Sequence, residues 1–252
     1  MPRPANSRPA KPRNRWFDHA AAQALMQAEQ RALIPVVTGV FGRSGLYLRP
    51  SAEAPRELSG NMLLSVLRLH GDDSRYRGDI HCEGTRLPLA DDSVNLVYAL
   101  HAFDTCPDAA GMAAEVARVL APEGVAVVVG LNPWSPWLLR WAGRGPRWQG
   151  AGSLRALLAL HGLEVYRRNG VGPVLPIAPS GRGSDREGRD WLGRLRAGYA
   201  LLARKRRSGL TPLPLAPARP ALALKPFAPA NRACVHGMDG DAHARREICR
   251  AG

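Results

Sequence analysis

Residues 83–97 read EGTRLPLADDSVNLV, and this stretch is the most informative part of the 252-residue chain. It leads from an acidic residue through a Leu-Pro loop and an aspartate pair into the apolar run 94–100, which is typical of a buried strand. Apolar positions at helical spacing follow over 109–120, and the β-branched run 125–129 predicts another buried strand. The alternation of strand, helix and strand predicts an α/β fold built on a parallel sheet.

The segments before this stretch predict a helix and further strands. Helical spacing extends over 16–40, with Asp18 near the expected N-cap and Pro35 expected to end or kink the helix. Glycines then predict a helix terminus and loop before a short first strand. The loop glycines are at 39, 42 and 45, and the first strand is expected at 46–48. The chain then predicts a buried strand or short helix over 61–70, a polar turn over 71–78 and a strand end at 79–83.

The segments after it complete the predicted sheet. Residues 122–124 predict a turn before the strand at 125–129. Ser153 is the expected N-cap of a helix that runs to His161, with Gly162 as its C-cap. The other expectations are strands at 163–167 and 197–204, with a long Gly-, Pro- and Arg-rich loop over 170–190.

The formal net charge of +14 is concentrated at the two ends of the chain. Residues 1–15 carry +5 and residues 204–252 carry +7, which leaves +2 for residues 16–203. We therefore expect a basic disordered arm at 1–15, a nearly neutral domain at 16–207 and a Pro- and Arg-rich disordered tail at 208–252. The basic ends fit either contact with nucleic acid or a plain solvated surface.

Composition excludes several classes of protein. Four cysteines in 252 residues do not make a disulfide scaffold and favour a reducing, cytoplasmic location. No apolar run reaches the roughly 18 residues of a membrane span, and no apolar segment follows the basic start as in a secretory signal. No Walker loop or nucleophile elbow occurs, and the cysteines and histidines of the tail lack zinc-ligand spacing, so no metal is expected.

The region 83–133 resembles the class I S-adenosylmethionine-dependent methyltransferases, in particular the group with the type 11 methyltransferase domain. The resemblance is carried by EGTRLPLADDSVNLV and by EVARVLAPEG at 115–124, which precedes the Val-rich strand. It implies a Rossmann-like, doubly wound, mostly parallel sheet with an antiparallel last strand. It also implies transfer of a methyl group from S-adenosylmethionine to an acceptor that the sequence does not name.

The resemblance implies a cofactor site at the carboxyl ends of the strands, where doubly wound sheets bind ligands. Its expected members are Tyr47, Arg49, Glu83, Gly84, Leu87 and Leu100. Glu83 would accept a bond from the adenine amino group, and the alternative is a surface turn residue. His101 is the candidate catalytic base, because its ordinary pKa lies near neutrality. The alternative is a strand-end histidine bonded to the backbone.

The first motif of the family is degenerate in this chain. Family members carry an acidic residue and a Gly-x-Gly turn after the first strand, whereas this chain has Arg49-Pro50-Ser51. Glycine serves there because it lacks a Cβ, so the replacement crowds or reshapes the turn. The acidic residue expected after the second strand is also not identifiable. A second hypothesis follows, in which the chain is a non-catalytic, methyltransferase-like binding module that contacts nucleic acid through its basic ends.

Four tryptophans follow the last parallel strand, at positions 134, 137, 141 and 148. The first three would share one face of a helix. They fit a wall on the acceptor side of the site, with Asn132, Trp134 and Trp137 as its expected members. Core packing and a patch that binds a membrane or a partner are the alternatives.

Overall fold

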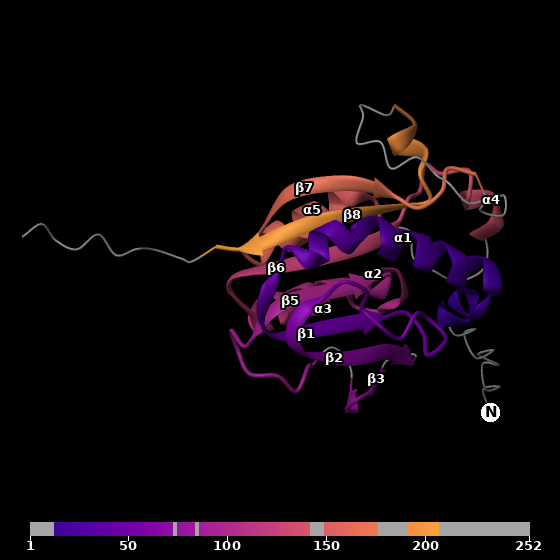
Figure 1. The fold of residues 1–252 in the computed structure, drawn as a ribbon. Coiled ribbons are helices and arrows are strands. Elements are labelled where there is room, and N and C mark those ends of the chain that lie inside the picture. The colour runs from indigo at the N-terminus through magenta and orange to yellow at the C-terminus, as the bar shows by residue number, and fades with distance from the viewer. Residues whose placement is uncertain (1–12, 73–74, 84–85, 142–148, 176–190, 207–252) are drawn as a thin grey trace, which may run out of the picture. The chain divides into compact units, whose positions relative to one another are not determined.

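Eight strands form one sheet in the order β4-β3-β2-β1-β5-β6-β8-β7 (Figure 1). The computed structural model describes residues 13–72, 75–83, 86–141, 149–175 and 191–206. The strands are β1 (Phe41–Arg49), β2 (Met62–Asp72), β3 (Arg75–Gly78), β4 (Cys82–Glu83), β5 (Val94–Leu100), β6 (Leu120–Leu131), β7 (Leu163–Val171) and β8 (Gly198–Lys205). The helices are η1 (Arg13–Asp18), α1 (Ala20–Thr38), α2 (Ala102–Thr105), α3 (Ala109–Val119), α4 (Leu138–Trp141), α5 (Ala151–Leu160) and η2 (Trp191–Leu195).

The four central strands, β2, β1, β5 and β6, confirm the predicted parallel, doubly wound sheet, and the strands that flank them are antiparallel. β1 pairs in parallel with β2 and β5, and β5 pairs in parallel with β6. The last strand, β8, lies between β6 and β7 and is antiparallel to both. The carboxyl ends of β1, β2, β5 and β6 therefore meet at one edge of the sheet, which we call the carboxyl edge.

Helices cover both faces of the sheet. In Figure 1, α1 crosses in front of the strands and α5 lies behind them. Alternate residues of β5 enter separate cores, with Leu96 and Tyr98 on the α1 side and Val97 and Ala99 on the side of α3 and α5. This period of two, with both faces buried, explains why β5 reads as a continuous apolar run.

The first helix and first strand both differ from the sequence prediction. Pro35 neither ends nor breaks α1, because it lies in the last turn, where its missing N–H removes only one helical bond. β1 begins at Phe41, so Gly42 and Gly45 lie inside the strand and not in a loop. A Cβ at Gly45 would overlap the side chain of Leu63 on β2, which gives this glycine a packing role.

Three further segments also correct the sequence prediction. The segment expected as a polar turn contains β3, which pairs antiparallel with β2 and β4. The turn expected at 122–124 lies within β6 as an irregularity, with Glu123 at φ 63° and a shift in register against β5. The helix α5 begins at Ala151 with Gly150 as its N-cap, so Ser153 lies in its first turn and donates to the Gly150 carbonyl.

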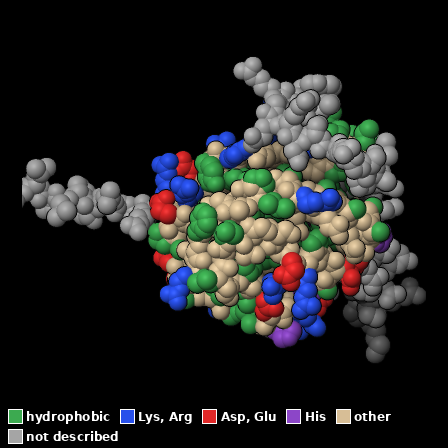
Figure 2. Space-filling view, viewed as in Figure 1, with side chains coloured by type: hydrophobic (Ala, Val, Ile, Leu, Met, Phe, Trp, Pro, Cys, Tyr) green, Lys and Arg blue, Asp and Glu red, His purple; other side chains and the backbone are tan. Residues whose placement is uncertain are grey.

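Acidic and basic side chains are interspersed on the face drawn in Figure 2, with a mixed cluster at its lower edge. This distribution agrees with the nearly neutral composition of residues 16–203. Residues 1–12 and 207–252, which hold most of the predicted basic arm and tail, lie outside the described residues. Within the part of the chain that the structure describes, no helix is long and apolar enough to cross a membrane.

Candidate functional site

His101 follows the last residue of β5 at the carboxyl edge and is fully buried. Its backbone has φ 47°, in the left-handed region, and α2 begins at the next residue. Such a conformation costs a non-glycine residue about 1 kcal/mol or more and is found preferentially at functional sites. The ring of Phe17, from η1, stacks on the His101 ring with centroids 5.1 Å apart and an interplanar angle of 30°.

Two carboxylates hold the His101 ring from opposite sides. Glu29, on α1, lies 2.7 Å from Nε2, and Asp104, on α2, lies 2.9 Å from Nδ1. The second contact shares Asp104 Oδ2 with the backbone N–H of Leu131, which donates at 3.0 Å. The three side chains of this Glu29–His101–Asp104 cluster are all buried and join α1, β5, α2 and the end of β6.

The carboxylates determine the charge state of the cluster. Burial by itself would lower the pKa of His101, but the Glu29 charge and the bonds to both carboxylates outweigh burial and raise that pKa to about 10. Burial raises the pKa of Asp104, and the bond to His101 opposes this shift. His101 is therefore a cation at neutral pH with both ring nitrogens engaged, so in this conformation neither nitrogen is free to accept an acceptor's proton.

The raised pKa of His101 predicts a stability that falls with rising pH. The imidazole titrates near 6.5 in the unfolded chain and near 10 in the folded protein. Its stabilisation is therefore complete below about pH 6.5 and is lost as the pH rises toward 10. We expect urea unfolding at pH 6, 8 and 9.5 to show this decline in the wild type and a clearly flatter profile in His101→Gln. If stability fell equally with pH in the two proteins, the decline would not come from His101. Other buried groups that titrate at high pH, such as the tyrosines, are present in both proteins and cannot cause a difference between them.

Two glycines make room for the Glu29 side chain. A Cβ at Gly198, the first residue of β8, would overlap Glu29 Oε1, and a Cβ at Gly172 would lie 3.3 Å from Glu29 Cγ. Gly172 also has φ 77°, a left-handed conformation in which any residue with a side chain would be strained. Neither Glu29 nor Asp104 was predicted as a site residue. The available signal was an acidic residue at position 29, on the apolar stripe that includes Leu25, Met26 and Leu33.

The turn after β1 does not have the form that the cofactor requires in the family. Arg49, Pro50 and Ser51 are all buried, and residues 50–61 cross back to β2 through turns without a helix. The Arg49 guanidinium donates through Nη1 to the carbonyls of Ala52 and Ala54, at 3.3 and 3.0 Å. These residues do not fit the glycine cradle expected for S-adenosylmethionine, because a long side chain fills the position where backbone would approach the ligand.

The other predicted site residues of β1 and β5 are parts of the core. Tyr47 is fully buried, where its hydroxyl donates to the Pro55 carbonyl and accepts from Gln30 Nε2. Leu100 is buried in the same core, on the α1 side of the sheet. The structure therefore brings Tyr47, Arg49, Leu100 and His101 to the carboxyl edge, as expected, but buries all four.

The predicted acceptor-side wall divides into buried and exposed members. Asn132 is buried and donates through Nδ2 to the carbonyls of Arg194 and Arg196, at 2.7 and 2.8 Å, which ties the end of β6 to the approach to β8. Trp137 lies in the core, whereas Trp134 is 80% exposed. Trp134 and Trp137 do not share one helical face, because both precede α4, which begins at Leu138. Trp134 is the one of the three with a side chain available to a ligand or partner.

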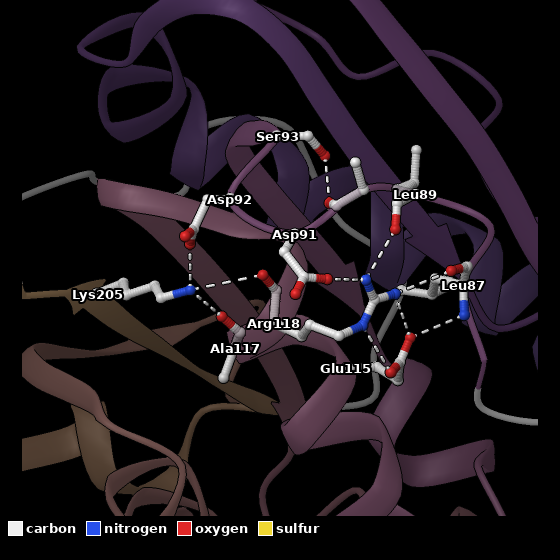
Figure 3. Close-up of polar contacts among 10 residues, drawn as sticks. Leu87, Leu89, Asp91, Asp92, Ser93, Glu115, Ala117, Arg118 and Lys205 are labelled. Atoms are coloured by element: carbon white, nitrogen blue, oxygen red, sulfur yellow. Dashed lines mark hydrogen bonds and ion pairs between the residues drawn. The ribbon is translucent and has the colours of Figure 1, made fainter.

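Residues 87–92 of the motif are bonded to α3 on the approach to β5, at the end of the sheet opposite the carboxyl edge (Figure 3). Arg118, near the end of α3, donates to the carbonyls of Leu87 and Leu89 at 3.0 and 2.8 Å. Its guanidinium also bonds to Asp91 and Glu115, and Glu115 accepts from the Leu87 N–H at 2.9 Å. The bond to Arg118 lowers the pKa of the Glu115 carboxyl. Leu87 therefore lies against α3 on the approach to β5, apart from Tyr47 and Arg49.

A second bridge in Figure 3 extends this network to the last strand. Lys205, at the end of β8, donates to Asp92 and to the Ala117 carbonyl, at 2.5 and 2.6 Å. The aspartate pair of the motif therefore anchors the loop before β5 to both α3 and β8. The motif residues serve the fold at this end of the sheet, while ligands of such sheets bind at the other.

The acidic residue of the motif, Glu83, ends β4 and pairs through its backbone with Arg75 of β3. Its side chain and Gly84 lie outside the described residues, so their predicted contacts with adenine stay predictions. Within the described part of the chain, no group of three His, Cys, Asp or Glu residues is arranged to hold a metal ion.

Comparisons with known proteins relate part of the chain to a protein family and its fold to solved structures. Residues 57–128 match the family model of a methyltransferase domain, type 11. A solved S-adenosylmethionine-dependent methyltransferase from Thermotoga maritima is 15% identical, with a TM-score of 0.52 over 76% of this chain and 94% of that chain. A second from Aquifex aeolicus is 11% identical, with a TM-score of 0.44 over 76% and 96% of the two chains. No curated protein sequence matches at a significant level.

Fold and sheet order define a class I methyltransferase fold. Within that fold class, the 57–128 region is the part of the chain that matches the type 11 methyltransferase-domain family. A chain from the complex between the Haloferax volcanii Trm112 methyltransferase activator and a methyltransferase is also similar, at 16% identity and a TM-score of 0.49 over 78% of this chain and 99% of that chain.

Proposed function

We propose that the protein is a cytoplasmic S-adenosylmethionine-dependent methyltransferase that transfers the methyl group directly to an acceptor and releases S-adenosylhomocysteine. The observation that carries the proposal is the family match over 57–128, which runs from before β2 into β6 and includes the carboxyl ends of β2 and β5. Methyl transfer demands chiefly alignment of the reactants and exclusion of water, so the absence of a free base does not count against it.

Within this proposal, the Glu29–His101–Asp104 cluster is a positioning device. It fixes the end of β5 and the start of α2 with a buried charge network, and the Phe17 ring shields the cluster from above. For His101 to act as the base, as the sequence suggested, at least one of its two carboxylate contacts must open. The exposed Trp134 side chain is the available part of the proposed acceptor wall. The acceptor itself is not identified by these residues.

A second candidate function rests on the turn after β1. Because Arg49 fills the place of the glycine cradle, the domain would bind a partner or ligand without methyl transfer. The family match does not favour this alternative. Contact with nucleic acid through the basic ends stays a prediction, since those ends fall largely outside the described residues.

Calorimetric titration of the full chain with S-adenosylmethionine and S-adenosylhomocysteine separates the two candidates. The proposal predicts saturable binding of both at up to millimolar concentration. Gly152→Ala, at an exposed position of α5 where an added Cβ meets no atom, is the control and is expected to leave this binding intact. Absence of heat with both ligands at millimolar concentration would exclude the methyltransferase and leave the binding module.

A further inference from the structure

We infer that the carboxyl ends of β1 and β2 form a binding site for a small oxyanion, a carboxylate or phosphate group, held by Arg49, Ser51 and His70. The inference rests on bond donors that the fold itself leaves without acceptors. It goes beyond the proposed function, because the site would exist whether or not the protein transfers methyl groups.

Arg49 is a buried cation without a counter-ion. Its residue is 5% exposed, and no carboxylate of the described chain lies within ion-pairing distance of the guanidinium. Within the described chain, Nη1 donates to the two loop carbonyls, whereas the buried Nε has no bonding partner. A guanidinium taken out of water without a paired anion is costly, so a native fold that retains one points to an anion that completes it.

Three acidic residues near the carboxyl ends of β1 and β2 are bonded to other groups. Glu57 pairs with Arg68 at 3.1 Å, and Asp72 pairs with Arg77 at 2.8 Å. Asp79 accepts from the backbone N–H of Arg68 at 2.8 Å. The protein therefore holds acids in this neighbourhood yet places none of them against Arg49.

Two further donors lie at the same edge. The Ser51 hydroxyl, two residues after Arg49, is buried without a partner, and so is Nδ1 of His70. Arg49 and His70 are direct register partners on the paired strands, so their side chains leave the same face of the sheet. Burial, and then the nearby Arg49 charge, lower the pKa of His70. An oxyanion would oppose both effects by accepting a bond from the imidazole.

Arg49, Ser51 and His70 all offer hydrogen-bond donors, so a ligand rich in acceptor oxygens fits them best. A guanidinium offers donors and no acceptor, and a hydroxyl and an imidazole can both donate. Ribose hydroxyls bind well to carboxylates, which this set lacks, whereas carboxylate and phosphate oxygens are acceptors throughout. Binding would exchange the bonds from Nη1 to Ala52 and Ala54 for stronger, charge-assisted bonds to the anion. The loop 52–57 would have to shift, including Ala54, which is buried in the core on the α1 side.

A phosphate and an amino-acid carboxylate present the same kind of acceptor oxygens, and the experiment distinguishes these two sources. Thermal unfolding of the full chain distinguishes them with four probes, each against sodium chloride at matched ionic strength. The probes are inorganic phosphate, S-adenosylhomocysteine, 5′-methylthioadenosine, which lacks the amino-acid carboxylate, and methionine. We expect a rise in melting temperature with phosphate, or with S-adenosylhomocysteine or methionine but not with methylthioadenosine, because a ligand that binds only the folded state stabilises it.

The variants test whether the shift depends on the three donors. Arg49→Gln should abolish it, and Ser51→Ala and His70→Gln should each weaken binding by about tenfold, the loss of one charge-assisted bond. Arg56→Gln removes an exposed arginine of the same loop and should leave the shift unchanged. If Arg49→Gln does not fold, the other two variants decide. No shift with any probe, or an equal shift in Ser51→Ala, His70→Gln and wild type, would overturn the site, whatever the outcome for methyl transfer.

Discussion

Glu29→Ala should lower the free energy of unfolding by about 4 kcal/mol, the cost expected when one member of a buried ion pair is removed. Glu29 lies 2.7 Å from His101 Nε2, and both side chains are fully buried. The substitution leaves a buried imidazolium with only Asp104 beside it, and the imidazole then loses its proton or the cluster opens. For a domain of this size, the melting temperature should fall by roughly 10 °C.

Glu53→Ala is the matched control, since it removes an exposed carboxylate from the loop after β1. It should change stability by less than about 0.5 kcal/mol. Denaturant titration of both variants and the wild type at pH 7 makes the comparison. A loss under about 1 kcal/mol in Glu29→Ala would show that the buried cluster does not stabilise the fold.

Gly198→Ala is expected to cost about 3 kcal/mol, because overpacking a closed site forces neighbours to shift. The added Cβ would overlap Glu29 Oε1 and lie 3.1 Å from the Gly130 carbonyl oxygen. Relief requires the Glu29 carboxylate to turn away from His101, so one methyl group on β8 would disturb the charge cluster at the end of β5.

The dependence on Glu29 makes this prediction specific. In the Glu29→Ala background, Gly198→Ala should cost much less than in the wild type, with a coupling energy of about 1 to 3 kcal/mol between contacting residues. Gly152→Ala, at an exposed helical position with no atom within contact distance of the added Cβ, is the control and should be neutral or slightly stabilising. Additive costs in the double variant would contradict the packing of Gly198 against Glu29.

Much of the fold was predictable because its signals are local. The apolar run of β5, the helical spacing of α3 and the β-branched part of β6 each read directly as an element of the sheet. Errors arose where tertiary context overrode a local rule. Gly42 and Gly45 lie inside a strand, where the absence of a Cβ leaves room for the side chains of Asn95 and Leu63 on the neighbouring strands. The hairpin partner β3 arose from a segment whose polar residues read as a turn.

The candidate site was predictable in position but not in character. The spacing of the motif placed His101 and Arg49 at strand ends, and the structure agrees. The sequence carried no sign that His101 would be sealed between Glu29, 72 residues away, and Asp104. Such a contact depends on how α1 packs across the sheet, which no local pattern records.

The sequence alone therefore determined the class of fold, the resemblance of residues 83–133 to a methyltransferase family and the departure from that family's glycine turn, since these reside in contiguous residues and their spacing. Only the tertiary structure decided what the motif and the turn do. The EGTRLPLADD stretch is anchored by Arg118 and Lys205 at one end of the sheet, while Arg49 is buried at the other without a counter-ion. The physical reason is that charge pairing and burial depend on which distant segments meet.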